Sequence, residues 1–300
     1  MKGLILKNAY YDAPVYAHQC ARIKEELEKL GIAADVRAND FFPASLDGDV
    51  HAKTGYDFCV FLDKDKYVGE MLERAGMRLF NSAAAVAACD DKMLTAIRLS
   101  GIGVPMPRTL PGLLCYTPSA EIKPRAAAKV AELGFPVVVK TAHGSMGKGV
   151  FRADDEEQLL ALMEKVKCSP HLFQEYIAES AGRDLRVIVV GGRVLGGMER
   201  VSDGDFRSNI GAGGSGRPYP VGADAAALCV KIADALGLDF CGIDLLFGRR
   251  GMLLCEVNSN AFFKEFESVT GVNVAAAYAR HIADTMAKEA APQSGAASFR

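Results

Sequence analysis

Two acidic residues interrupt a pair of apolar runs near the end of the chain, in the sequence CGIDLLFGRRGMLLCEVNSN. Asp244 lies in the first run and Glu256 in the second, and a Gly-Arg-Arg-Gly turn separates the two runs. This pattern predicts a β-hairpin that holds the two acids near the same rung, one on each strand. Asn258 follows Glu256 by two residues and therefore leaves the same face of its strand.

Oxygen atoms from two carboxylates and one amide would meet on this face, and they are the ligands that Mg²⁺ and Mn²⁺ prefer. An ion bound in this way commonly also holds the phosphates of a nucleotide. The alternative is a solvated hairpin with ordinary surface acids. The flanking leucines, however, leave little polar surface, and an unpaired buried acid would cost free energy. We therefore interpret Asp244, Glu256 and Asn258 as candidate metal ligands.

A glycine-rich loop, HGSMGKG at residues 143–149, lies between two predicted strands, and Lys140 closes the apolar strand before it. Small residues such as Gly144, Ser145 and Gly147 let backbone amides close on an anion, while a lysine supplies the countercharge. The loop does not have the spacing of a phosphate-binding P-loop, and a strand rather than a helix follows it. The pattern favours a hairpin flap over phosphates, with a plain mobile hairpin as the alternative.

Three arginines, Arg186, Arg200 and Arg207, follow over the next predicted strands and loop. A guanidinium group can bind phosphate or carboxylate in a bidentate manner, although surface salt bridges explain these residues equally well. The segment 202–220 is long, polar and glycine-rich, and such loops are commonly functional. Within it, Arg207 and Asn209 flank a single residue, so an extended backbone would turn both side chains toward the same face. Both are candidates for holding a substrate carboxylate.

Composition excludes several classes of protein. Half of the 300 residues are hydrophobic and the net charge is −2, which suits one large or two medium domains. There is no basic block and no apolar run of about 20 residues, so no nucleic-acid or membrane partner is expected. The eight cysteines are scattered without a C-x-x-C pair, and the N-terminus lacks a secretory pattern. We expect reduced cysteines and a cytoplasmic protein.

The first 90 residues, which must position part of this chemistry, alternate between strand and helix patterns. Strand patterns occupy residues 3–6, 33–37, 57–62 and 77–80, and helix patterns occupy residues 15–30, 66–75 and 83–89. Such alternation predicts a small parallel sheet of the open α/β type. No glycine fingerprint follows the first strand, so a dinucleotide-binding domain of the usual kind is not expected.

The rest of the chain changes to a mixed pattern with antiparallel character. Helix patterns occupy residues 91–100, 125–133, 155–167, 223–236 and 272–288. Strand patterns occupy residues 137–140, 149–152, 172–177, 185–190 and 193–200, besides the hairpin with the two acids. Residues 109–123 give no clear pattern, and residues 201–220 are expected to form a polar loop. These elements predict an α+β body attached to the α/β segment.

The order of the motifs resembles that of a known superfamily. Along the chain come DK at 91–92, PVVVK at 136–140, HGSMGKGV, QEYI, DLRVIVV, MER, FRSN, GIDLL and EVNSN. This combination is similar to the ATP-grasp superfamily, and within it to the RimK-type α-L-glutamate ligases, over residues 1–288. The resemblance implies an ATP-grasp fold with an N-terminal pre-ATP-grasp parallel-sheet domain. The implied parts are a pre-ATP-grasp domain at 1–90, an ATP-grasp domain at 91–288 (flap subdomain about 105–178, metal and ATP lobe about 179–288) and a flexible tail at 289–300.

The resemblance also implies a role for each candidate residue. The set that binds ATP comprises the phosphate lysines, the flap and the adenine and ribose contacts: Lys92, Lys140, Gly144, Ser145, Gly147, Gln174, Glu175, Tyr176, Ile177 and Asp184, with Glu179 as the alternative to Asp184. The set that holds Mg²⁺ or Mn²⁺, with two ions expected, is Asp244, Glu256 and Asn258. The catalytic set, at the acyl-phosphate end, is Arg186, Arg207 and Asn209.

The implied activity is that of an ATP-dependent carboxylate–amine ligase. It would join an amino acid, with glutamate as the candidate, to a carboxylate of a peptide or small molecule through an acyl phosphate. Its partners would be ATP, the amino acid and the carboxylate acceptor, and a homo-oligomer is left open. The alternatives are an ATP-grasp phosphotransferase acting on a small acid and a nucleotide-binding regulatory module without turnover. The chain departs from the ligase pattern at residues 210–212 and after EVN, both on the acceptor side, so the acceptor stays unassigned.

Overall fold

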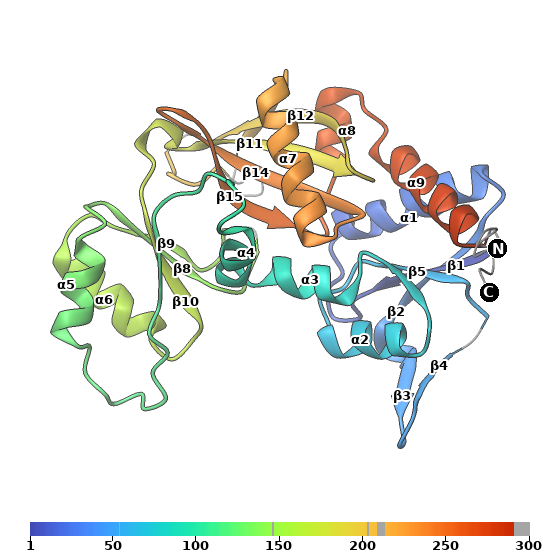
Figure 1. Ribbon diagram of the computed structural model, residues 1–300, viewed down its shortest axis with the longest axis horizontal. Helices are drawn as coiled ribbons and strands as arrows, with labels where there is room; N and C mark the ends of the chain where they lie inside the picture. The colour runs from blue at the N-terminus through green and yellow to red at the C-terminus, as the bar shows by residue number, and fades with distance from the viewer. Residues whose placement is uncertain (54, 146, 203, 209–213, 291–300) are drawn as a thin grey trace, which may run out of the picture. The chain divides into compact units, whose positions relative to one another are not determined.

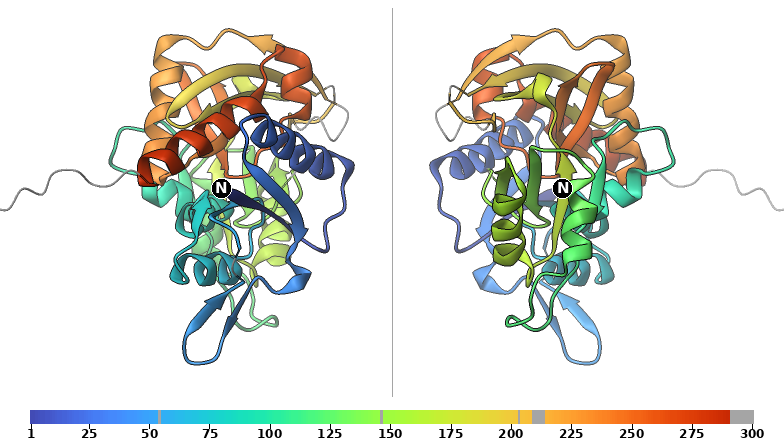
Figure 2. Two further views of the ribbon diagram at one scale, coloured as in Figure 1. Left: turned by 90° about the vertical axis from the view of Figure 1, so that its right-hand side faces the viewer. Right: turned by 90° about the vertical axis from the view of Figure 1, so that its left-hand side faces the viewer.

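The N-terminal segment forms the parallel sheet that its alternating pattern predicts (Figure 1). The computed structural model describes residues 1–53, 55–145, 147–202, 204–208 and 214–290. The elements of the N-terminal segment are β1 (Lys2–Lys7), α1 (Pro14–Lys29), β2 (Ala33–Ala38), the 3₁₀ helix η1 (Asn39–Phe41), β3 (Ala44–Leu46), β4 (Val50–Ala52), β5 (Phe58–Phe61), α2 (Lys66–Arg74) and β6 (Arg78–Phe80). The parallel strands have the order β2–β1–β5–β6. The antiparallel β3–β4 hairpin, which extends away from this sheet, was not predicted (Figure 2).

Two antiparallel sheets follow, with the strand orders β7–β10–β8–β9 and β13–β12–β11–β14–β15. The elements are α3 (Ala83–Asp90), α4 (Lys92–Leu99), β7 (Thr109–Pro111), α5 (Pro124–Ala131), β8 (Val137–Thr141), β9 (Val150–Ala153), α6 (Glu156–Val166), β10 (His171–Glu175), the 3₁₀ helix η2 (Ala178–Ser180), β11 (Arg183–Val190), β12 (Arg193–Val201), β13 (Ser215–Tyr219), α7 (Ala223–Leu236), β14 (Phe240–Gly248), β15 (Gly251–Asn258), α8 (Lys264–Thr270) and α9 (Val274–Ala290). The predicted combination of an α/β segment with an α+β body is confirmed.

The chain divides into two compact units. The first consists of Met1–Ala83, Phe262–Glu267 and the residues from Gly271 onward, and the second consists of Ala84–Ala261 with Ser268–Thr270. In this grouping α9 belongs to the N-terminal unit. There α9 packs along α1, and the buried Tyr278 hydroxyl donates to the Phe80 carbonyl at 3.0 Å.

The five-stranded sheet has an apolar face and a charged face. Leu185 and Val187 of β11 are fully buried and pack against Ile232 of α7, which lies along this face (Figure 2). Because side chains alternate along a strand, the neighbouring residues Asp184 and Arg186 leave the opposite face. In the smaller sheet, α5 and α6 cover one face in the same way, with Phe173 of β10 packed beneath them (Figure 1).

The prediction of a loop at residues 201–220 is wrong for the second half of this segment. Strand β13 lies there and pairs antiparallel with β12 as the edge of the five-stranded sheet. Pro218 lacks the N–H group that an inner strand needs, but an edge strand tolerates this loss. Helix α8 and strand β7 are further elements that the patterns did not predict.

All eight cysteines are free, as expected for reduced residues. Among the helices that the structure describes, none combines the length and the apolar character that crossing a membrane would require.

Glu26 of α1 offers a test of the packing between α1 and the start of α9. Its Oε1 accepts hydrogen bonds from Asn273 Nδ2 at 3.1 Å, Arg22 Nη2 at 2.8 Å and Lys29 Nζ at 3.1 Å. The bond from Asn273 is the largest influence, and together these donors lower the pKa of Glu26 from 4.5 to about 2 although burial opposes them. Because the pKa is lower in the folded protein, the stabilisation is present above pH 4.5 and is lost as the pH falls toward 2.

We expect Glu26→Gln to lower the free energy of unfolding by about 1–2 kcal/mol at pH 7 and to have no effect near pH 2. Urea unfolding at a series of pH values measures this difference. The exposed Glu28→Gln is the matched control and should change little. A loss of stability in Glu26→Gln that is the same at every pH would contradict the assignment.

Candidate active site

A row of charged side chains crosses the face of the five-stranded sheet that is opposite to α7. Asp184 of β11 lies directly opposite Arg200 of β12, and Arg186 of β11 lies opposite Asp244 of β14. Asp244 in turn lies opposite Glu256 of β15, which confirms the prediction that these two acids share a rung. Side chains opposite each other on neighbouring strands share a face, so the sheet brings all five together.

The arginines of this row are paired with acids inside the protein. Arg186 Nη2 lies 2.8 Å from Asp244 Oδ2, and its Nε donates to the other oxygen of the same carboxylate. Arg200 donates to both oxygens of Asp184, at 2.7 and 2.5 Å, and its Nη2 also lies 3.0 Å from Asp244 Oδ2. Asp184 and Asp244 are each 4% exposed and Arg200 is 6% exposed. The alternative of surface salt bridges is therefore excluded for Arg186 and Arg200.

These charges keep Asp244 ionised although it is buried. Burial by itself raises the pKa of this carboxyl group, but the charges and hydrogen bonds of Arg186 and Arg200 outweigh burial and lower the pKa below 3.8. The two acids likewise raise the pKa of Arg200 against the opposing effect of its burial. Asp244 and Arg200 therefore stabilise each other's charged form.

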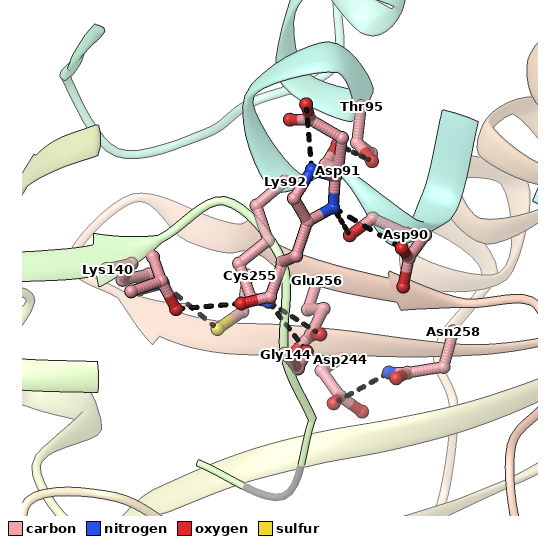
Figure 3. Close-up of polar contacts among 12 residues, drawn as sticks. Asp90, Asp91, Lys92, Thr95, Lys140, Gly144, Asp244, Cys255, Glu256 and Asn258 are labelled. Carbon is pink, nitrogen blue, oxygen red and sulfur yellow. Dashed lines mark hydrogen bonds and ion pairs between the residues drawn. The ribbon is translucent and has the colours of Figure 1, made fainter. Parts of the chain in front are cut away.

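Two lysines from different segments point toward β15 (Figure 3). Lys92, the first residue of α4, places Nζ 3.5 Å from Glu256 Oε1 and 3.0 Å from the Gly144 carbonyl oxygen, to which it donates. Lys140 of β8 is buried, and its Nζ donates to Gln174 Oε1 at 2.8 Å and lies 3.9 Å from Cys255 Sγ. Both ammonium groups are thus held next to the charged row.

A cavity of about 740 Å³ is lined from both antiparallel sheets. Most of the predicted site residues contribute to its walls: Lys92, Lys140, Gly147, Gln174, Glu175, Tyr176, Ile177, Asp184, Arg207, Asp244 and Glu256. Residues far apart in the sequence therefore surround one space.

The remaining predicted residues lie beside the cavity or outside the described part of the chain. Arg186 contacts it through Asp244, and Asn258 Nδ2 lies 3.4 Å from Asp244 Oδ2. Gly144 accepts from Lys92, whereas Ser145 takes part in the turn of the flap and is not one of the wall residues. Asn209 and residues 210–212 lie outside the residues that the structure describes.

The flap is an antiparallel hairpin of β8 and β9, as predicted. Gly149 has a φ of +78°, and a Cβ atom there would lie 2.2 Å from Thr141 Oγ1, so the close approach of these strands requires glycine. Arg207 Nη1 donates to the Gly147 carbonyl at 3.0 Å, and its Nη2 lies 2.6 Å from Asp205 Oδ2. The hydrogen bonds that Arg207 donates to the Asp205 carboxylate raise the pKa of Arg207. Arg207 thus connects its own loop to the flap.

The predicted adenine side begins where β10 ends. The Glu175 carboxylate accepts from the Arg108 backbone N–H at 2.8 Å, so it is the backbone near Ile177 that remains for a ligand in the cavity. The two ribose candidates differ in their positions. Asp184 lines the cavity, whereas Glu179 pairs with Arg249 and is not one of the wall residues.

Several residues of the cavity wall were not predicted as site residues: Ser180, Arg183, Arg200, Phe206, Ser208, Leu246 and Cys255. Arg200 is the most consequential of them, because it bridges Asp184 and Asp244. Cys255 directly precedes the predicted ligand Glu256, and burial raises the pKa of its thiol to about 11 although Lys140 opposes this. The sequence predicts that Arg200 lies on a strand, but it does not predict which residue lies opposite Arg200 on the neighbouring strand.

The residues on β14 and β15 fit a divalent cation by their chemistry. Asp244, Glu256 and Asn258 supply two carboxylates and one amide oxygen on one face, which are hard donors suited to Mg²⁺ or Mn²⁺. Within the described residues, no three His, Cys, Asp or Glu side chains are grouped in the manner of a metal site. The two carboxylates are instead paired with arginine and lysine. A bound ion would therefore share these acids with the cations already present.

Comparison with known proteins identifies the family of the chain. The family model described as RimK-like ATP-grasp domain matches residues 113–282. The chain is 42% identical over 217 residues to β-citrylglutamate synthase B of Danio rerio, covering 71% of this chain and 52% of the relative. It is 39% identical over 215 residues to N-acetylaspartylglutamate synthase A of Homo sapiens, covering 71% of this chain and 54% of the relative. The chain thus spans about half the length of these relatives.

A solved structure shows the same fold. The RimK domain ATP-grasp protein from Sphaerobacter thermophilus DSM 20745 superimposes with a TM-score of 0.70 at 20% identity, covering 94% of this chain and 99% of that one. The two antiparallel sheets that share one cavity therefore constitute an ATP-grasp fold, and the parallel sheet precedes them. The chain belongs to the RimK-like ATP-grasp family, as the order of its motifs indicated.

Lys140 gives a direct test of the nucleotide site. We expect Lys140→Met to weaken ATP binding at least about tenfold, equivalent to 1.4 kcal/mol, because a buried positive charge beside the flap is removed. Isothermal titration calorimetry measures the change. The exposed Lys231→Met is the matched control and should bind ATP as the unaltered protein does. An unchanged affinity in Lys140→Met would show that the phosphates bind elsewhere.

Proposed function

We propose that this protein is an ATP-dependent carboxylate–amine ligase. The observation that carries the proposal is that two lysines, a hairpin flap and a row of paired charges all line one cavity in an ATP-grasp fold. In such a reaction the substrate carboxylate attacks the γ-phosphate of ATP, which gives ADP and an acyl phosphate. The amino group of the second substrate then displaces phosphate and leaves an amide.

The side chains support this sequence by binding and by charge. Lys92 and Lys140 offer ammonium groups for the phosphates, and charged donors that face a transferring phosphoryl group stabilise its transition state. The flap covers the cavity and would exclude water, which protects an acyl phosphate from hydrolysis. Arg186 and Arg207 offer guanidinium groups for the carboxylate and the negative charge that develops on it. No nucleophilic side chain is required, because positioning supplies the rate.

Asp244, Glu256 and Asn258 are the residues that would hold the divalent ions, for which two Mg²⁺ or Mn²⁺ ions are proposed. When bound, such ions neutralise phosphate oxygens and help to orient them. Of the two acids in this set, Asp244 is already paired with two arginines. The cation nearest to Glu256 is Lys92, and it is 3.5 Å away. Glu256 is accordingly the residue on which we expect the dependence on metal to rest.

Glutamate is the amino acid that we propose as the amine substrate. Both curated relatives described above are named for a product that contains glutamate, whereas their names differ in the other component. The acceptor remains a carboxylate of a small molecule or peptide. Residues 210–212 lack the basic residue expected of glutamate ligases that extend acidic tails, which favours an acceptor with few negative charges.

A screen for phosphate release tests the proposal. Purified protein with ATP and Mg²⁺ is supplied with glutamate and a panel of carboxylates and peptides, and products are identified by mass spectrometry. We expect ADP, phosphate and an amide, with the product lost in EDTA and reduced at least about 100-fold by Glu256→Ala, since a metal ligand is removed. The exposed Glu157→Ala is the control. A stable phosphoryl ester instead of an amide would identify a phosphotransferase, and nucleotide binding without turnover would identify a regulatory module.

Arg207 allows binding to be separated from catalysis. We expect Arg207→Ala to lower kcat by about 30-fold to 1,000-fold, equivalent to about 2–4 kcal/mol of transition-state stabilisation, with a much smaller change in the KM for ATP. The reason is that its charge matters most when negative charge builds up on the substrate. Steady-state kinetics with the best acceptor from the screen gives both constants. The exposed Arg98→Ala is the control, and near-normal turnover in Arg207→Ala would refute the role.

A further inference from the structure

The short strand β10 separates two cavities. Leu172 and Gln174 line the side that contains the candidate nucleotide site. His171 and Phe173 line a second cavity of about 1010 Å³, as expected from the alternation of side chains along a strand. The two cavities have no wall residue in common. The second cavity therefore lies behind the sheet and is not part of the site already described.

The walls of the second cavity are mainly apolar. They come from β7, β10, the segment after β7, α5 and α6, which lie together in Figure 1, and include Leu110, Leu113, Leu114, Ile122, Met163 and Phe173. Leu113 is 67% exposed and Leu114 is 42% exposed, so apolar side chains also stand at the mouth. A concave apolar site with few polar groups is the usual form of a small-molecule site.

His171 is the polar group within these walls. It is 6% exposed, its ring lies edge-on to Phe173 with centroids 5.2 Å apart, and its Nδ1 lies 2.7 Å from the Ser169 carbonyl oxygen. A carbonyl oxygen only accepts hydrogen bonds, so Nδ1 carries a proton and Nε2 of the neutral ring is an acceptor. Among the described residues, no hydrogen-bond partner is found for Nε2. This nitrogen is not among the fully buried atoms that lack a partner, so it keeps some accessible surface and is open to a donor.

The backbone fixes the His171 ring in this position. A Cβ atom at Gly112 would lie 2.2 Å from Cδ2 and 2.3 Å from Nε2 of His171, so only glycine allows the chain to pass the ring. The Gly112 N–H donates to the His171 carbonyl oxygen at 2.8 Å, which joins the two segments. The ring is therefore held by contacts on two sides before any ligand binds.

The charged groups at the edge of the cavity do not select an anion. Lys167 Nζ donates to the Ala120 carbonyl at 2.7 Å and also pairs with Glu164. Lys129 pairs with Glu132 at the surface. Glu121 and Lys123 also belong to the walls, and both are exposed to solvent. The charged groups are thus paired or solvated, so the recognition that the cavity offers is apolar contact together with one acceptor nitrogen.

We propose that this cavity is a second ligand site, which takes a small, mostly apolar aromatic molecule that carries one N–H or O–H donor. The apolar walls bind the ring system, and His171 Nε2 accepts the hydrogen bond. This site goes beyond the proposed ligase activity and does not depend on it, because its walls are separate from those of the nucleotide cavity.

Indole and benzofuran are suitable probes, because they have nearly the same shape and only indole carries an N–H donor. Binding to the protein is measured by ligand-observed NMR and calorimetry, with and without a non-hydrolysable ATP analogue. We expect saturable binding of indole, about fivefold weaker binding of benzofuran, and no competition by the analogue. Equal affinities for the two probes, absence of saturation, or displacement by the analogue would each overturn the proposal.

Two kinds of variant locate the site. His171→Phe keeps an aromatic ring but removes the acceptor, so it should bind indole and benzofuran equally. Ala126→Leu, and separately Ala120→Leu, place extra volume in the cavity and should weaken both probes at least about tenfold. Affinity for the ATP analogue reports whether each variant is folded. If either Ala126→Leu or Ala120→Leu no longer binds the analogue, the other of these two variants is used. A preference for indole that persists in His171→Phe would refute the role of this residue.

Discussion

The ion pairs between Asp244 and the two arginines are the interaction on which the rest of the site depends. Asp244 lies in the middle of a strand and is almost completely buried, so it requires compensating charge. Removing one partner of such a buried pair typically costs about 3–5 kcal/mol, because the other charge is left uncompensated. Arg200 contacts Asp244 and Asp184 together and thereby fixes the relative positions of the proposed metal and ribose contacts.

Local sequence signals were sufficient to predict the elements whose ends are determined by their own capping or turn residues. Helix α7 begins and ends where its pattern predicts, and Asp155 caps α6 by accepting a hydrogen bond from the Gln158 N–H. The hairpin of β14 and β15 turns at the two arginines as predicted. By contrast, β13 was missed because its pairing with β12, rather than its own polar and proline-containing sequence, makes it a strand. The order of the motifs indicated the family, and the resemblance to this family predicted most of the residues that line the cavity.

The sequence placed Asp244 and Glu256 near the same rung, but the full arrangement of charges could not be obtained from it, because two register shifts determine which residues are directly opposite. In the hairpin of β11 and β12, a register shift between Ile188 and Val189 places Arg200 opposite Asp184; without it, Glu199 would be opposite. A second shift, between Asp244 and Leu245, places Glu256 rather than Cys255 opposite Asp244. A bulge adds one residue to one strand and so changes which side chains face each other. Counting from the turn therefore gives the position of these side chains to within one residue but not their exact partners.

Lys140 has a consequence for the protein without its ligand. Its ammonium group is buried beside an amide oxygen and a thiol, and no carboxylate pairs with it among the residues that the structure describes. A buried cation without a countercharge costs folding free energy, and a bound phosphate would remove that cost. The empty protein is thus less stable than its core would allow, and a ligand that binds only the folded state stabilises it in proportion to the logarithm of its concentration. The persistence of the folded protein in a cell, and hence its abundance, then depends on the supply of nucleotide.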